Sequence, residues 1–159
     1  MTMKATAKKR VLGLAVLFAA VALSYAAAAA KGKQPTTTPI GDLKWEDLMP
    51  GAPIKISILW GDRNKGPEYA MLLKVPGGFE AGMHSHTADY HSVLVTGTWI
   101  HTNEGEAAPK ELAPGSHIYQ PGKQLHNDKC KGPEECIIFI HQHGKGDFIP
   151  AKAPAPEKK

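Results

Sequence analysis

The sequence predicts a single all-β domain, built as a sandwich or a closed barrel. Two observations lead to this prediction. Short segments rich in apolar and β-branched residues recur at intervals of about ten residues, with glycine and proline clusters between them. Only one stretch, residues 44–49 with Asp42 as a candidate cap, has the pattern of a helical turn.

The expected strands follow one another along most of the chain. The first has the clearest pattern, because Ile54, Ile56 and Ile58 alternate with polar residues, and a period of two is typical of a half-buried strand. The others are apolar or aromatic segments bounded by turn residues, at 69–75, 84–86, 90–95, 98–101, 111–112, 116–120 and 136–143.

The first 30 residues are predicted to be a signal peptide and no part of the fold. Four basic residues precede the apolar segment 11–23, which is shorter than the ~20 residues that span a bilayer, and small residues follow it. Cleavage after Ala26, Ala28 or Ala30 fits this pattern, and an uncleaved N-terminal anchor is the alternative. We therefore expect a periplasmic or secreted protein.

The remaining chain is long enough for one core and one domain. Residues 31–39 are polar and rich in proline, so they are predicted to be a linker. Residues 151–159 are predicted to be a disordered tail. The folded domain is then expected at residues 40–150.

The predicted leader also explains the basic charge of the whole chain. It holds 4 of the 19 basic residues and none of the 15 acidic residues, so 15 of each remain in the mature part. In addition, no segment of the mature part has the pattern of a basic patch that binds nucleic acids or anionic membranes. We therefore expect no nucleic-acid partner and, once the leader is removed, no stable association with a membrane.

The histidines indicate a metal site. All eight lie between residues 84 and 143. His84 and His86 are two residues apart, which places both imidazoles on one face of a strand. Two such imidazoles can supply half of the ligands of a divalent transition metal. His126, on a distant segment, is the best candidate for a third ligand.

Two segments resemble the sequence motifs of the cupin family. In the first motif, G-x5-H-x-H-x(3,4)-E-x6-G, residues Gly78, His84, His86 and Gly97 stand at the expected positions, but the glutamate is absent.

The second cupin motif is G-x5-P-x-G-x2-H-x3-N. Gly115, Pro121 and His126 match it, whereas the inner glycine is displaced to Gly122 and Cys130 stands at the asparagine position. The resemblance implies a single-domain cupin-like jelly-roll β-barrel that binds a metal through the three histidines. It also allows a homodimer formed through the barrel.

The position of the missing glutamate leaves the fourth ligand open. The motif offset favours Tyr90, which would give a three-histidine site with a phenol nearby. Strand parity favours His91, because His91 would share a face with Val93 and Val95. We prefer His91 as the fourth ligand, with Tyr90 as the alternative and Asp89 as a less favoured carboxylate ligand.

Neutral nitrogen ligands favour one divalent transition metal, Fe, Zn, Ni or Cu, over Mg or Ca. Without the glutamate, such a site keeps the full charge of the metal and should attract an anionic or enolate-like small molecule. Three-histidine cupins that cleave enolisable substrates with dioxygen are the nearest analogy, so a dioxygenase-like enzyme is one hypothesis. A non-catalytic periplasmic module that binds or senses a metal or small ligand is the other.

Cys130 and Cys136 are the only cysteines, and Gly132-Pro133 between them can turn the chain. In an exported protein such a pair is expected to form a disulfide.

His141 and His143 repeat the H-x-H spacing, but no third ligand follows at a suitable distance in the sequence, so a second metal site is not favoured. His101, beside Trp99, could face the pocket or the solvent, and the solvent is favoured; His117 is interpreted as a structural residue.

Overall fold

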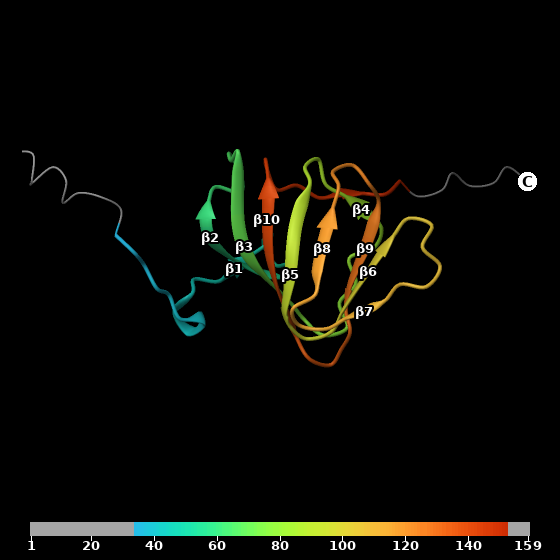
Figure 1. Cartoon of the computed structure of the whole chain (residues 1–159), viewed down its shortest axis with the longest axis horizontal. Helices are drawn as coiled ribbons and strands as arrows, with labels where there is room; N and C mark the ends of the chain where they lie inside the picture. Colours follow the sequence, from blue (N-terminus) through green and yellow to red (C-terminus); the bar gives the residue numbers. More distant parts are fainter. Residues whose placement is uncertain (1–33, 153–159) are drawn as a thin grey trace, which may run out of the picture. The chain divides into compact units, whose positions relative to one another are not determined.

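The computed structural model describes residues 34–152 of the chain. Residues 40–152 form a domain of two antiparallel sheets with one short 3-10 helix, Ile40–Asp42 (Figure 1). The strands are β1 (Glu46–Asp47), β2 (Lys55–Gly61), β3 (Glu68–Val75), β4 (His84–Ser85), β5 (Tyr90–Thr96), β6 (Trp99–Asn103), β7 (Glu111–Leu112), β8 (His117–Gln120), β9 (His126–Cys130), β10 (Cys136–His143) and β11 (Ile149–Pro150).

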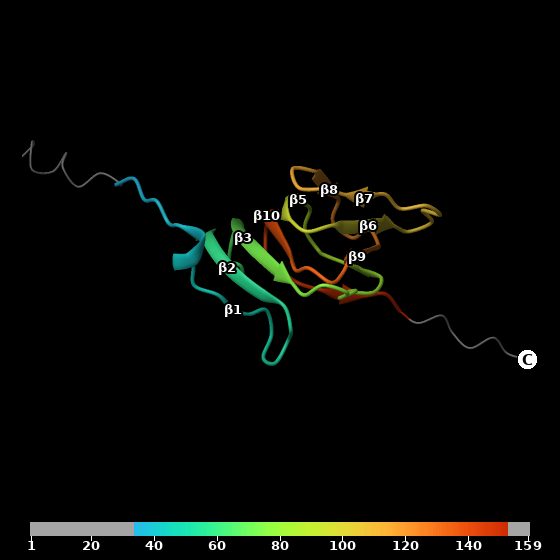
Figure 2. The same ribbon diagram turned by 90° about the horizontal axis from the view of Figure 1, so that it is seen from below.

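The strand order brings distant segments of the chain together. The larger sheet has the order β1-β2-β3-β10-β5-β8, and the smaller has the order β11-β4-β9-β6-β7. Figure 2 shows the two sheets from below, with β2, β3 and β10 on one side and β6, β7 and β9 on the other. This arrangement confirms the predicted all-β jelly-roll barrel.

Alternation along the strands separates an inner face from an outer face. On β10, Ile138 is buried and packs in the core with Val75 and Leu94, and cross-strand pairing aligns all three on the inner face. Trp99 of the smaller sheet closes the same core from the other side. The core therefore lies between the two sheets, as expected for side chains that alternate with period two.

The structure differs from the sequence prediction in three short segments. The helical turn predicted at 44–49 does not form; Glu46 and Asp47 instead pair with β2, and Asp47 makes an ion pair with Lys55. The strands β9 and β11 were not predicted, because neither segment shows the apolar alternation of a half-buried strand.

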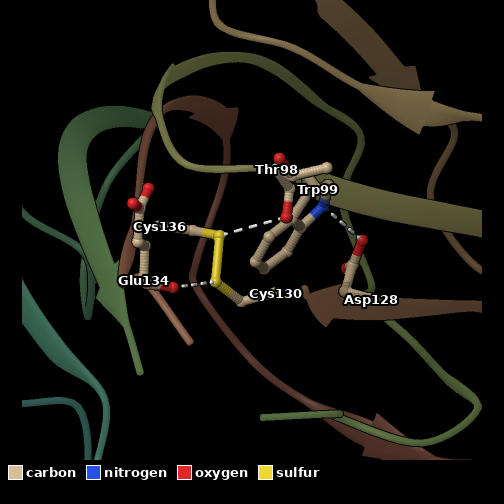
Figure 3. Close-up of a disulfide and its surroundings, with 6 residues drawn as sticks. All are labelled: Thr98, Trp99, Asp128, Cys130, Glu134 and Cys136. Carbon is tan, nitrogen blue, oxygen red and sulfur yellow. Dashed lines mark hydrogen bonds between the residues drawn. A yellow bond between two sulfur atoms is a disulfide. The ribbon is translucent and has the colours of Figure 1, made fainter. Parts of the chain in front are cut away.

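The predicted disulfide joins Cys130 at the end of β9 to Cys136 at the start of β10. It therefore links the smaller sheet to the larger one by a covalent bond. Both cysteines are fully buried, and Trp99 lies next to the bond (Figure 3). The Trp99 indole extends from this point toward Asp128, to which its Nε1 donates a hydrogen bond of 3.1 Å.

The predicted signal peptide at 1–30 lies outside the described residues, as does most of the predicted tail. Within residues 34–152, no helix is long and apolar enough to cross a membrane.

Candidate metal centre

Three histidines meet at one end of the barrel interior. His84 lies on β4 and is paired with His126 on β9, and His86 follows β4 by one residue. His84 and His126 are buried, and His86 is partly exposed. One ring nitrogen from each of the three residues lies within 4.8 Å of the others. The structure thus brings together the three residues that the sequence predicted as metal ligands.

Main-chain carbonyl groups fix the orientation of the three imidazoles. Nδ1 of His84 lies 2.8 Å from the Gly82 oxygen, and Nδ1 of His126 lies 3.2 Å from the Gln124 oxygen. Nδ1 of His86 contacts the Asp147 main-chain oxygen in the same way. A carbonyl oxygen can only accept, so each Nδ1 must carry the proton.

The consequence is that the Nε2 of each neutral ring is unprotonated and has a lone pair that can bind a metal or accept a hydrogen bond. In metal proteins a ligating histidine commonly donates its other ring N–H to a carbonyl or carboxylate, which fixes the tautomer. The three rings therefore have the tautomer and the convergence that a bound transition metal requires.

Burial also favours the neutral form of the rings. It lowers the pKa of His126 to about 4, although the nearby Asp128 carboxylate acts in the opposite direction. The pKa of His84 is lowered for the same reason. Because burial disfavours the charged imidazolium, protons compete weakly with a metal for these two residues at neutral pH.

Tyr90 occupies the place of the glutamate of the cupin motif. Its side chain is buried, and its hydroxyl lies 3.3 Å from His126 Nε2. Burial raises the pKa of the phenol well above its usual value, so the hydroxyl stays protonated and can donate to this nitrogen.

The preference for His91 as fourth ligand was wrong. His91 is exposed on the outer face of β5, where its Nδ1 lies 3.0 Å from Nε2 of His117. The parity argument assumed that Val93 and Val95 face the core, but Val95 is 41% exposed, and Ser92 faces inward instead. The apolar side chains of β5 therefore do not mark its inner face, because that face carries polar residues next to the site.

Asp89 also lies outside the histidine cluster. The close group of possible ligands among the described residues contains His84, His86 and His126 but not Asp89. Its main-chain oxygen accepts a hydrogen bond from the His143 N–H instead.

Asp128, which is not among the predicted site residues, supplies a carboxylate next to two of the three imidazoles, those of His84 and His126. It is two residues after His126 on β9 and so shares its face. Its Oδ2 lies 3.5 Å from His126 Nε2 and 3.8 Å from His84 Nε2. The spacing of two that predicts a shared face for His84 and His86 also predicts a shared face for His126 and Asp128, so Asp128 could have been identified from the sequence.

His101 on β6, for which the solvent was favoured over the pocket, instead pairs with this carboxylate. Its Nδ1 lies 2.8 Å from Asp128 Oδ1, and its Nε2 lies 3.1 Å from the Gln120 side-chain oxygen. Burial alone would lower the pKa of His101, but the hydrogen bond and the charge of Asp128 outweigh it and raise the pKa. Burial likewise opposes ionisation of Asp128, yet the neighbouring histidines hold its pKa below the usual value.

An apolar cavity of about 120 Å³ opens from the histidine cluster into the barrel. His84, His86 and Tyr90 line its polar end. The opposite walls are aliphatic and aromatic, formed among others by Leu73, Val75, Phe79, Ile118, Ile138 and Ile140. A mainly apolar cavity with a few convergent polar groups is the usual form of a small-molecule site.

Arg63, in the loop between β2 and β3, adds a positive charge to this cavity. Its guanidinium interacts with Tyr69, whose hydroxyl also donates to the Gln142 side chain at 2.8 Å. The Nε of Arg63 is buried and has no hydrogen-bond partner among residues 34–152. A buried donor without a partner is costly. This nitrogen is covered by Gly146, where a Cβ would lie only 2.7 Å from it.

Comparison with known proteins places the chain in a family. The profile of a family described as "Domain of unknown function (DUF4437)" matches residues 39–148, which include strands β1 to β10 and all the residues of the site. The chain belongs to the DUF4437 family. No curated protein matches the sequence.

Solved structures show that this DUF4437 chain has the cupin fold. KdgF from Halomonas sp. superposes with a TM-score of 0.55 at 20% identity, over 70% of this chain and 96% of that one. An RmlC-like cupin from Shewanella frigidimarina gives a TM-score of 0.53 at 21% identity, over 75% and 94%. The polyketide cyclase RemF from Streptomyces resistomycificus gives 0.61 at 15% identity, over 76% and 88%. The cupin resemblance inferred from the two motifs is therefore confirmed.

Proposed function

We propose that this protein is an exported cupin that holds one divalent transition metal and acts on a small organic anion. The observation that carries the proposal is the convergence of three imidazoles, each with Nδ1 held by a main-chain carbonyl, at the polar end of an apolar cavity. Such an arrangement prepares the Nε2 atoms to bind a metal that a ligand in the cavity can reach.

His84, His86 and His126 would hold the ion, with Asp128 and Tyr90 beside it. Three nitrogen donors suit Fe, Ni, Cu or Zn, and the ion would act as a Lewis acid toward an oxygen of the ligand. Without the glutamate of the motif, the charge of the ion was expected to be uncompensated. The Asp128 carboxylate would compensate part of it, although His101 partly neutralises this carboxylate. Tyr90 can donate a hydrogen bond to a ligand atom near His126.

Access to the cavity favours an enzyme over a closed metal-storage site. His84 and His86 line the cavity, so coordination positions on that side are open to a small molecule. One structure with the same fold is a polyketide cyclase, which supports an organic substrate. The reaction type, dioxygenase-like or not, depends on the identity of the metal.

Arg63 favours an anionic ligand, because this positively charged residue lines the same cavity. Guanidinium groups bind carboxylates with two parallel hydrogen bonds, so a carboxylate on an aliphatic chain is the simplest chemistry that would satisfy both Arg63 and the apolar wall.

The ligand proposal can be tested with cobalt-loaded protein, whose visible absorption changes when a ligand enters the site. We expect acetate and butyrate to change the spectrum. Butyrate should bind about tenfold more tightly, since each additional buried CH₂ contributes ~0.8 kcal/mol. Arg63→Met should weaken butyrate at least ~10-fold, because hydrogen bonds to charged groups contribute ~1.5–3 kcal/mol. Uncharged butyramide should be affected little by this substitution.

Lys65→Met is the matched control, because Lys65 is in the same loop and carries the same charge, but its side chain is 85% exposed. It should leave butyrate binding unchanged. An equal loss of butyrate affinity in Lys65→Met would mean that Arg63 acts only through its long-range positive charge and not through direct contact with the ligand. A spectrum that responds to none of the three probes would favour a non-catalytic metal-binding or sensing module.

We further propose that the chain is exported and processed. The basic and apolar pattern of residues 1–30 supports this, and the buried disulfide is compatible with an oxidising compartment. Mass spectrometry of the protein from the periplasm or medium of an expressing bacterium should give a mature N-terminus between Ala27 and Lys31. Recovery of intact chains that begin at Met1, in the cytoplasm alone, would contradict it.

A further inference from the structure

A second group of metal-ligating side chains lies on the outer face of the larger sheet. His141 and His143 are both on β10, and their side chains point away from the core, on the face opposite to Gln142. Glu68 begins β3 and is the register partner of His143. The third ligand of the His141-x-His143 pair is not visible in the neighbouring sequence, because it comes from a strand more than 70 residues earlier.

The three side chains already lie at the distances of a chelating group. Glu68 Oε2 is 3.1 Å from His141 Nε2, and the rings of His141 and His143 are 4.9 Å apart between centroids. One ligand atom from each residue lies within 4.8 Å of the others. Exposure of Glu68 and His143 leaves further coordination positions open to water.

We propose that Glu68, His141 and His143 form a second, solvent-accessible site for a late first-row divalent ion such as Cu²⁺, Ni²⁺ or Zn²⁺. Two imidazoles and one carboxylate are a recognised ligand set for such ions, and nitrogen donors disfavour Ca²⁺ and Mg²⁺. The site is independent of the proposed function, since β10 separates it from the inner cavity.

Each of the two sites has its own tryptophan. The ring centroids of Trp60 on β2 and His141 are 6.0 Å apart. Trp99 instead lies at the inner site, where it donates a hydrogen bond to Asp128. A paramagnetic ion quenches an indole at such short range. Quenching of Trp60 therefore reports binding at the outer site. The fluorescence of Trp60 is obtained by subtracting the signal of the Trp60→Phe variant, which contains only the other tryptophans.

The test is a Cu²⁺ titration of the mature chain with its inner site already loaded with Zn²⁺. We expect saturable quenching of the Trp60 component. Glu68→Gln and His143→Ala should each raise the Cu²⁺ concentration at half-quenching by at least ~10-fold, because even the loss of a residue that only supports a ligand typically costs 10–100-fold in affinity. Both side chains are exposed, so these variants should fold.

His117→Ala is the matched control, because His117 is an exposed histidine of the same sheet that contacts His91 rather than the proposed site. It should leave the midpoint unchanged. A midpoint that shifts in His117→Ala but not in His143→Ala would place the ion at the His91–His117 pair and overturn the proposal. Quenching that is linear and unaffected by Glu68→Gln would overturn it as well.

Discussion

Replacing His126 with alanine is expected to remove most of the metal that the purified protein carries. The loss should be at least ~10–100-fold in affinity, since changes that only affect the support of a metal ligand already cost that much. His126 is fully buried, and its Nε2 lies between Tyr90 and Asp128, so no solvent-exposed residue can replace it. Elemental analysis after passage over a chelating resin, with protein purified without a histidine tag, measures the result.

Two further variants make this result decisive. His126→Gln retains a polar side chain of similar size and should lose the metal while circular dichroism still shows a folded barrel, which separates loss of a ligand from loss of the fold. His91→Ala should retain the metal of the wild type, because His91 lies on the outer face. If His126→Gln keeps its metal and His91→Ala loses it, the inner site is not the metal site.

Gly97→Ala is expected to destabilise the domain by about 2–5 kcal/mol, through backbone strain and a steric clash together. Gly97 has a φ of +86°, and a left-handed conformation costs an L-residue ~1–2 kcal/mol. A Cβ at this position would also lie 2.8 Å from Cys136 Sγ and 2.9 Å from the Glu135 oxygen, and overpacking of this kind costs a further ~1–3 kcal/mol. Urea denaturation of the metal-free protein, followed by tryptophan fluorescence, gives the free energy of unfolding.

Gly115→Ala separates the two contributions. Gly115 has a similar φ of +90°, but apart from its chain neighbours no heavy atom of residues 34–152 lies within 4 Å of the position that a Cβ would take there. Only the backbone cost of ~1–2 kcal/mol therefore applies. Equal effects of the two substitutions would show that the contact with the disulfide does not constrain the turn at Gly97.

The fold and the three clustered imidazoles could be predicted from the sequence, because both depend on the spacing of residues along the chain. His84 and His86 stand at a period of two, and His126 follows a glycine and proline turn at the offset of a known motif. Such spacings determine which side chains share a face, and cross-strand pairing of His84 with His126 then brings them together.

The rest of the site could not be predicted, because it depends on which face of each strand is inward. Apolar residues usually mark that face, but β5 has Val95 outside and Ser92 inside. The place of His101 in the site could not be predicted for a related reason: it depends on the pairing of β6 with β9, where His101 is opposite Asp128. Long-range register of this kind leaves no local pattern in the sequence.

The main-chain carbonyls that hold the three imidazoles have a consequence for how this site tolerates mutation. Their oxygens belong to Gly82, Gln124 and Asp147, and every amino acid has the same carbonyl group. Alanine scanning around the site would therefore leave these three acceptors in place, so their role would not appear in such a scan. Only changes that redirect the backbone itself can remove them. The chain can thus vary the residues around its ligands during evolution while the ligand orientation is inherited with the path of the polypeptide.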